Sequence, residues 1–155
     1  MEVRDMGWRQ NMIQKATIAD LPEVAVLLEE FRGLSRFLDG DQRVFIQSWT
    51  GLLNSDVGVI FMQREAGKIV GLLGGVAYPD VNTGRLVATE FFWFVRESAR
   101  GGGLRLYKDF ERWAQARGCQ TIQMVHLLDV QPERMERLYH RMGFSAVETH
   151  YMKAL

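Results

Sequence analysis

The sequence is poor in several features that define whole classes of protein. Its 155 residues include one cysteine, Cys119, which can form neither an internal disulfide bond nor, by itself, a zinc site. His140 and His150 have no cluster of metal-ligand residues around them, so we predict no metal centre. No N-terminal apolar run resembles a secretion signal. We therefore expect a protein of the reducing cytoplasm.

Net charge and long apolar runs are also missing. The 19 basic residues balance 19 acidic residues, which leaves no global field to attract nucleic acid or an anionic membrane. The longest apolar stretches, such as residues 86–95, are much shorter than the roughly 20 residues that a membrane helix needs. We predict a soluble protein with neither a nucleic-acid nor a membrane partner.

What the sequence does contain is typical of one globular domain. Hydrophobic residues make up 47% and charged residues 25%, at a length close to the commonest single-domain size. Residues 1–11 carry no clear period, and we expect a flexible lead-in there, followed by a single domain over residues 12–155.

Apolar periodicity alternates between strand and helix patterns along the chain. We predict a mixed α/β fold, with helices on both faces of a sheet. The expected strands cover residues 12–17, 57–64, 69–78, 86–95, 121–128 and 146–153, and the expected helices cover residues 20–33, 41–54, 103–117 and 132–142.

The most informative motif is a glycine-rich turn between a predicted buried strand and an amphipathic helix. It contains Arg100, three consecutive glycines at 101–103, Leu104 and Arg105. Such a turn directs unpaired backbone N–H groups and the positive end of a helix dipole at one point, which suits a phosphate. Glycines let the backbone approach the anion, and the arginines add positive charge. A flexible loop that binds nothing is the alternative.

A second motif follows about forty residues later, where Leu138-Tyr139-His140-Arg141-Met142-Gly143-Phe144 ends a predicted helix. With the glycine turn, it resembles the GNAT superfamily of N-acetyltransferases, whose loop reads R/Q-x-x-G-x-G/A and whose later helix ends in L-Y-x-x-x-G-F. The resemblance covers residues 17–155 in element order. The two motifs look most like those of phage-encoded and prophage-encoded members.

The resemblance implies a mixed, mostly antiparallel sheet and acetyl-CoA as the cosubstrate. Acetyl-CoA would lie between the strands that end near Val95 and Leu128, which the family splays apart. The residues that would contact it are Phe94, Val95, Arg100, Gly101, Gly102, Gly103, Leu104 and Arg105. Arg105 departs from the family pattern, which usually has a small residue there, and it would either contact or crowd the pyrophosphate.

Two side chains are candidates for proton transfer. By resemblance, Tyr139 would protonate the departing thiolate, since a phenol ordinarily titrates near pH 10 and a thiol near pH 8.5. Its alternative is a core tyrosine. Glu90 is the one acid in an apolar run, where burial would raise its pKa and suit it to accept a proton from an amine. Its alternative is a structural ion pair, for example with Arg85. The usual family position of this glutamate has the opposite side parity, which a β-bulge would reconcile.

We therefore predict an N-acetyltransferase in which an amine attacks the thioester directly in a ternary complex. The acceptor would be a small-molecule or peptide amine. The alternative is an inactive CoA-binding or assembly module with the same fold. A homodimer is compatible with this fold, although no sequence feature points to one. His126 would either relay a proton, contact substrate or pack as a core residue.

Overall fold

The computed structural model describes residues 12–35, 40–99 and 101–155. The chain divides into two compact units, residues 1–125 and residues 126–155, and each unit has its own description below. The predicted lead-in at residues 1–11 lies outside the described residues. The single domain expected for residues 12–155 stays a prediction.

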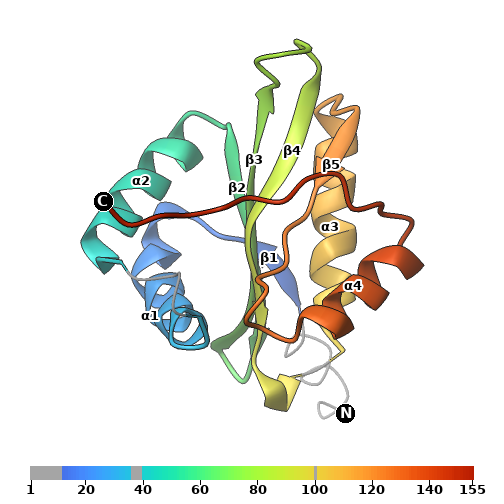
Figure 1. The fold of residues 1–155 in the computed structure, drawn as a ribbon. Helices are drawn as coiled ribbons and strands as arrows, with labels where there is room; N and C mark the ends of the chain where they lie inside the picture. Colours follow the sequence, from blue (N-terminus) through green and yellow to red (C-terminus); the bar gives the residue numbers. More distant parts are fainter. Residues whose placement is uncertain (1–11, 36–39, 100) are drawn as a thin grey trace, which may run out of the picture. The chain divides into compact units, whose positions relative to one another are not determined.

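The first unit is built on a five-stranded sheet with the strand order β1-β2-β3-β4-β5 (Figure 1). Neighbouring strands from β1 to β4 are antiparallel, whereas β5 lies parallel to β4. The strands are β1 (Ile13–Lys15), β2 (Gly58–Glu65), β3 (Lys68–Pro79), β4 (Leu86–Val95) and β5 (Thr121–Gln123). The predicted mixed α/β, mostly antiparallel fold is therefore confirmed.

Local sequence explains the central hairpin. Ala66 and Gly67 connect β2 to β3, with φ angles of 48° and 79°. Two consecutive positive φ angles define the tight turn whose twist matches a two-stranded ribbon, and glycine adopts such an angle without steric cost. The predicted antiparallel hairpin is confirmed.

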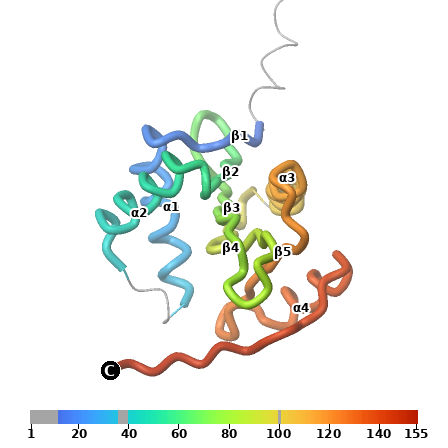
Figure 2. The backbone as a smooth tube through the Cα atoms, turned by 90° about the horizontal axis from the view of Figure 1, so that it is seen from above, coloured from blue at the N-terminus to red at the C-terminus, as the bar shows by residue number. Residues whose placement is uncertain are grey.

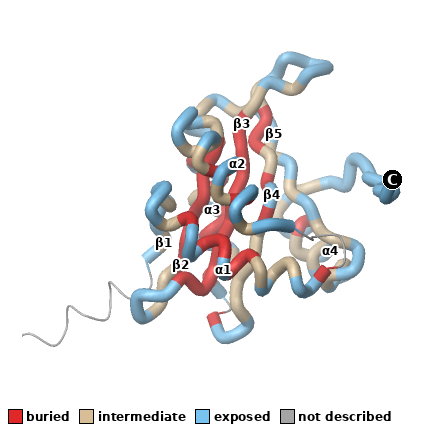
Figure 3. The backbone as a smooth tube through the Cα atoms, turned by 90° about the vertical axis from the view of Figure 1, so that its left-hand side faces the viewer, coloured by how far each residue is buried: buried red, intermediate tan, exposed pale blue. Residues whose placement is uncertain are grey.

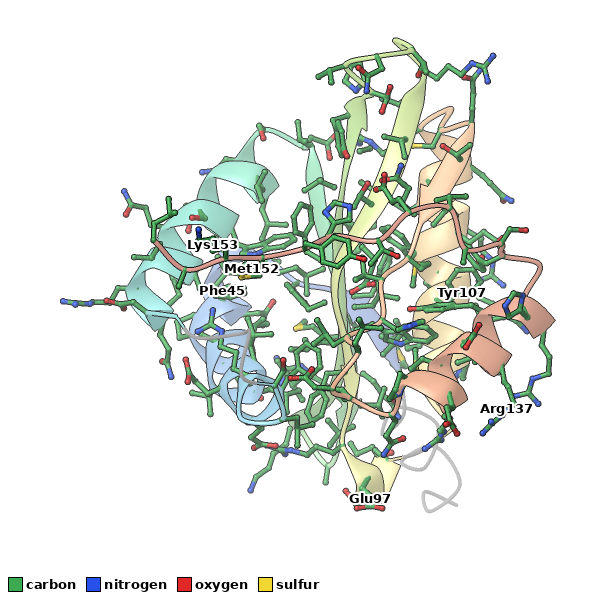
Figure 4. The ribbon with its side chains drawn as sticks, viewed as in Figure 1. Phe45, Glu97, Tyr107, Arg137, Met152 and Lys153 are labelled. Atoms are coloured by element: carbon green, nitrogen blue, oxygen red, sulfur yellow. The ribbon has the colours of Figure 1, made fainter. Side chains whose placement is uncertain are left out.

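Helices cover both faces of the sheet, as the end-on view in Figure 2 shows. Helices α1 (Leu21–Arg32) and α2 (Gln42–Asn54) pack on one face, and α3 (Gly103–Ala116) packs on the other. Phe45 of α2, labelled in Figure 4, lies 6.0 Å from the ring of Phe92 on β4. On the opposite face, α3 buries Leu106, Tyr107, Phe110, Trp113 and Ala114. Figure 3 shows that burial is concentrated in β2, β3, β4 and the helix surfaces that face them.

A β-bulge interrupts β4. Phe92 pairs with Gly74 of β3, but Glu90, rather than Phe91, pairs with Gly75. Phe91 is therefore the extra residue, and its side chain is 60% exposed. This bulge reverses the side parity of Glu90 relative to a regular strand, and the role of Glu90 stays a prediction.

The second unit contains one helix, α4 (Pro132–Arg141), followed by residues without helix or strand. The strand predicted at 146–153 is wrong, because residues 126–155, all described, include no strand. A strand needs a partner for its N–H and C=O groups, and this unit contains none. The strand predicted at 121–128 is also too long, because β5 ends at Gln123.

Candidate functional site

The glycine turn joins the end of β4 to α3 through a short 3-10 helix, η3 (Glu97–Ala99), at whose start Glu97 is labelled in Figure 4. Helix α3 begins at Gly103, and its N-cap residue, Gly102, offers no side-chain hydrogen bond. The N–H groups of the first helical turn consequently have no side-chain acceptor at the N-cap. Of the predicted loop residues, Arg100 lies outside the described part of the chain. The remaining loop has the form of an anion site at a helix start.

The three glycines differ in their conformation and surroundings, whereas the approach of an anion to their backbone stays a prediction. Gly101 has a φ of 104°, a conformation that side-chain-bearing residues rarely adopt. Gly102 has an ordinary φ of −77°, but a Cβ on it would overlap the carboxamide of Gln63. A Cβ on Gly103 would meet Trp93 and Val95 only at 3.6 Å, an ordinary contact. Of the three, only Gly101 needs glycine for its backbone conformation, whereas a Cβ on Gly102 would force the carboxamide of Gln63 to move.

Arg105 lies in the first turn of α3 and is exposed. Together with Lys108 and Arg112 it lines a hollow of about 330 Å³, which Met12, Ile13 and Asp109 also line. Three basic side chains therefore follow one another along α3. A cation in the first turn faces the positive end of the helix dipole, an unfavourable position unless an anion lies nearby.

The end of β4 has one open edge. Strand β4 pairs with β3 over its whole length, but it pairs with β5 only at Val87, Ala88 and Thr89. From Glu90 to Val95 the other edge of β4 has no strand partner among the described residues. Phe94 packs its ring on Phe31 at 5.4 Å, so its partly buried side chain contributes to the packing against the core.

Glu90 lies where β4 and β5 stop pairing. Its side chain is 4% exposed, and its Oε2 accepts a hydrogen bond from the N–H of Val125 at 3.0 Å. Burial raises the pKa of Glu90 to about 7, although the hydrogen bond from Val125 partly opposes this shift. No described basic side chain forms an ion pair with Glu90, so the structural ion pair considered from sequence does not form within the described residues.

The second unit contains the other proton-transfer candidate. Tyr139 of α4 is 8% exposed and packs between two aromatic rings. The imidazole of His126 stacks on it at 6.2 Å with an interplanar angle of 13°, and Phe144 approaches edge-on at 5.5 Å. The sequence is compatible with a core role or a catalytic role for Tyr139, and these ring contacts are compatible with both.

Sequence reasoning missed Gln63. This residue lies on β2 directly after the apolar run Val57-Gly58-Val59-Ile60-Phe61-Met62, and it is 4% exposed. Its Nε2 donates to Glu65 at 3.3 Å, but its buried Oε1 has no hydrogen-bond partner among the described residues. A lone amide in a strand otherwise rich in buried apolar side chains was the available signal.

Sequence comparison identifies the family to which these features belong. The model of the acetyltransferase (GNAT) family matches residues 23–144, and the chain belongs to this family. The family's reaction is acetyl transfer from acetyl-CoA, and the chain shares both the family's sequence pattern and its fold. No curated protein sequence matches the chain well enough to identify a relative.

Solved structures share the fold at low sequence identity. A ribosomal-protein-alanine N-acetyltransferase from Brucella melitensis biovar Abortus 2308 is 20% identical, with a TM-score of 0.71 over 94% of this chain and 99% of that one. An acetyltransferase from Trypanosoma brucei is 21% identical, with a TM-score of 0.72 over 94% and 99%. An aminoglycoside N-acetyltransferase in complex with CoA is 18% identical, with a TM-score of 0.71 over 94% of each chain. None of these supports the resemblance to phage-encoded members.

Two further observations concern the described residues alone. Within 12–35, 40–99 and 101–155, no group of three or more His, Cys, Asp or Glu side chains could hold a metal ion. No helix in this part of the chain combines the length and apolar character needed to cross a membrane.

Proposed function

We propose that this protein transfers the acetyl group of acetyl-CoA to a primary amine of a small molecule or peptide, by direct attack in a ternary complex. The observation that carries the proposal is the buried carboxyl of Glu90, with a pKa raised to about 7, beside the open edge of β4. A base with this pKa is half ionised at neutral pH, where it can accept a proton from the amine as it attacks.

The glycine turn supports acetyl-CoA as the donor. The backbone N–H groups of Gly102, Gly103 and Leu104 would bind the pyrophosphate, and Arg105 would add positive charge beside it. The open edge of β4 offers the outward-facing backbone groups near Val95 to the amide-containing pantetheine arm. A phosphate at this helix start would also remove the unfavourable interaction between Arg105 and the helix dipole.

Acetyl-CoA supplies a thioester that an uncharged amine can attack without a covalent enzyme intermediate. Glu90, directly or through one water molecule, removes a proton from the amine as the new C–N bond forms. Backbone N–H groups near Val95 stabilise the oxyanion. As the C–S bond breaks, the phenol of Tyr139, assigned by family resemblance, protonates the thiolate. Solvent then carries the proton from Glu90 back to Tyr139, which leaves an amide and free CoA.

The acceptor is proposed only as a chemical class. A structurally similar aminoglycoside acetyltransferase from an uncultured soil metagenomic sample was solved in complex with sisomicin. In this chain, Phe91 exposes its ring on the face of β4 that Trp49 contacts, whereas Glu90 pairs with Gly75 on the face that Phe110 covers, so this ring does not flank the proposed base. We therefore propose no feature of the acceptor beyond its primary amine.

Calorimetric titration of the purified chain with acetyl-CoA, CoA and ATP tests the donor assignment. We expect both CoA compounds to bind more tightly than ATP, and Gly102→Glu to abolish this binding through overlap with Gln63 and repulsion of the phosphates. The matched control is Gly51→Glu on α2, because a side chain at Gly51 meets no atom within 4 Å. Wild-type protein that binds neither CoA compound would refute the donor assignment. Wild-type binding without transfer to polyamines, aminoglycosides, amino acids or lysine peptides would favour a binding module.

A further inference from the structure

The carboxamide of Gln63 occupies a space that two glycines leave open. On β3, Gly71 pairs with Gln63, and a Cβ on Gly71 would stand 3.2 Å from Oε1 of Gln63. On the other side, a Cβ on Gly102 would overlap the same carboxamide, with Nε2 only 2.5 Å away. Gln63 therefore fills the space between the sheet and the start of α3, directly beneath the glycine turn.

Backbone conformation does not explain why Gly102 lacks a side chain. Its φ of −77° and ψ of −20° are helical values that alanine adopts readily. Instead, a Cβ at this position would overlap the side chain of Gln63, whose carboxamide would have to move. Gly102 and Gln63 are thus sterically coupled, and a change at either residue alters the path available to the turn.

The hydrogen-bonding groups on the two sides of this contact are complementary. Oε1 of Gln63 is a buried acceptor without a donor among the described residues. Such unpaired buried acceptors are rare in native proteins. Directly above it, the first turn of α3 has donors without a side-chain cap, since Gly102 provides none. Leucine or methionine would fill the same space without an unpaired oxygen, so packing alone does not account for glutamine here.

We propose that Gln63 is a positioning residue for the CoA-binding turn. Its carboxamide supports Gly102, and in the CoA complex its Oε1 accepts a hydrogen bond from one backbone N–H at the start of α3. That bond fixes the turn so that the remaining N–H groups point outward at the pyrophosphate. Gln63 does not touch the reacting atoms. The inference rests on the proposed CoA function and extends it to a residue on β2.

The decisive variant is Gln63→Met, which keeps the length of the side chain but removes the acceptor. We expect its dissociation constant for CoA to rise about five- to tenfold, as befits one hydrogen bond. Its affinity for pantetheine, which lacks the pyrophosphate, should stay that of the wild type. Gln14→Met, an exposed glutamine on β1, is the matched control and should bind both ligands normally. In ¹⁵N-labelled wild-type protein, CoA but not pantetheine should shift the side-chain amide signal of Gln63.

The outcomes separate this inference from the proposed function. If the wild type binds no CoA, both the proposed function and the role of Gln63 are refuted. If the wild type binds CoA and folded Gln63→Met binds it equally well, only the role of Gln63 is overturned. An equal loss of CoA and pantetheine binding would also overturn it, because it would indicate general distortion rather than positioning of the turn.

A double-mutant cycle decides the matter if Gln63→Met fails to fold. We expect Gly102→Ala to weaken CoA binding and lower the melting temperature in the wild-type background, and to do so much less in the Gln63→Ala background. Additive effects of the two substitutions on both readouts would refute the coupling. Gly51→Ala is the glycine control, since nothing lies within 4 Å of a Cβ there.

Discussion

Gln63 on β2 and Glu90 on β4 are both 4% exposed, but burial acts on the two side chains in different ways. Glu90 can change its protonation, and burial shifts that equilibrium until its pKa reaches about 7. Gln63 cannot ionise, and burial leaves it with an oxygen that lacks a partner. The buried carboxyl of Glu90 can therefore exchange a proton, whereas the buried amide of Gln63 can only position the groups around it.

The comparison also separates two kinds of experimental signature. Variants of Glu90 should change the rate of the chemical step and its dependence on pH, with little effect on CoA affinity. Variants of Gln63 should change CoA affinity, with little effect on the pH profile. The predictions below challenge or refine this division.

The largest effect is expected for Glu90→Gln. At pH 7 the variant lacks the base, and we expect acetyl transfer at saturating substrate to slow by about 10² to 10⁴-fold. The rate should recover in part above about pH 9, where the amine begins to lose its own proton. The acidic limb near pH 7 in the wild-type profile should disappear, since that limb reports ionisation of Glu90. Steady-state rates from pH 6 to pH 10 provide the measurement.

A control and a contradicting result define this test. Calorimetry should show that Glu90→Gln binds CoA as tightly as the wild type, because the substitution preserves size and lies outside the turn. A variant with the wild-type pH profile would keep the enzyme but remove Glu90 as its base. Loss of folding would indicate that the carboxyl has a structural role.

Much of the fold and the glycine turn could be predicted from sequence. The pattern of apolar residues defines strands and turns whose residues lie close together along the chain. The hairpin turn at Ala66 and Gly67 and the bounds of β4 follow from local periodicity and glycine placement. The glycine turn was recognisable for the same reason, since its helix and its strand adjoin it in sequence.

The remaining features depend on contacts between distant segments. The bulge at Phe91 is defined by pairing with Gly74 and Gly75, and no local pattern indicates it. Likewise, the contact between Gln63 and Gly102 joins residues from β2 and the start of α3. The strand expected at 146–153 had a suitable pattern, but a pattern cannot provide the partner that a strand requires.

A second effect, smaller than that of Glu90→Gln, is expected for Tyr139→Phe. Only the hydroxyl is removed, so the ring contacts with His126 and Phe144 should persist and the protein should fold and bind CoA normally. If the phenol protonates the thiolate, transfer should slow by about ten- to a thousandfold. The acidic limb near pH 7 should remain, because it belongs to Glu90. An unchanged rate in the folded variant would assign Tyr139 to the core alone.

The smallest effect concerns stability and follows from the sign of the pKa shift of Glu90. Its pKa is raised from 4.5 to about 7 on folding, so the folded protein holds a proton between these pH values that the unfolded chain has lost. The stability that this proton provides is complete below about pH 4.5 and disappears as the pH rises through 7. A shift of this size corresponds to about 3 kcal/mol in the free energy of unfolding.

Glutamine at position 90 cannot ionise, so Glu90→Gln should lack this contribution to the pH dependence. The difference in unfolding free energy, variant minus wild type, should increase by about 3 kcal/mol between pH 4.5 and pH 8, because only the wild type is destabilised over that range. Urea unfolding at both pH values measures it, and other titrating groups cancel in the difference. For Gln63→Met the corresponding difference should be the same at both pH values, since neither side chain titrates. Parallel stability curves for Glu90→Gln and the wild type would mean that Glu90 is solvated enough to titrate normally, and the contrast between the two buried side chains would then be lost.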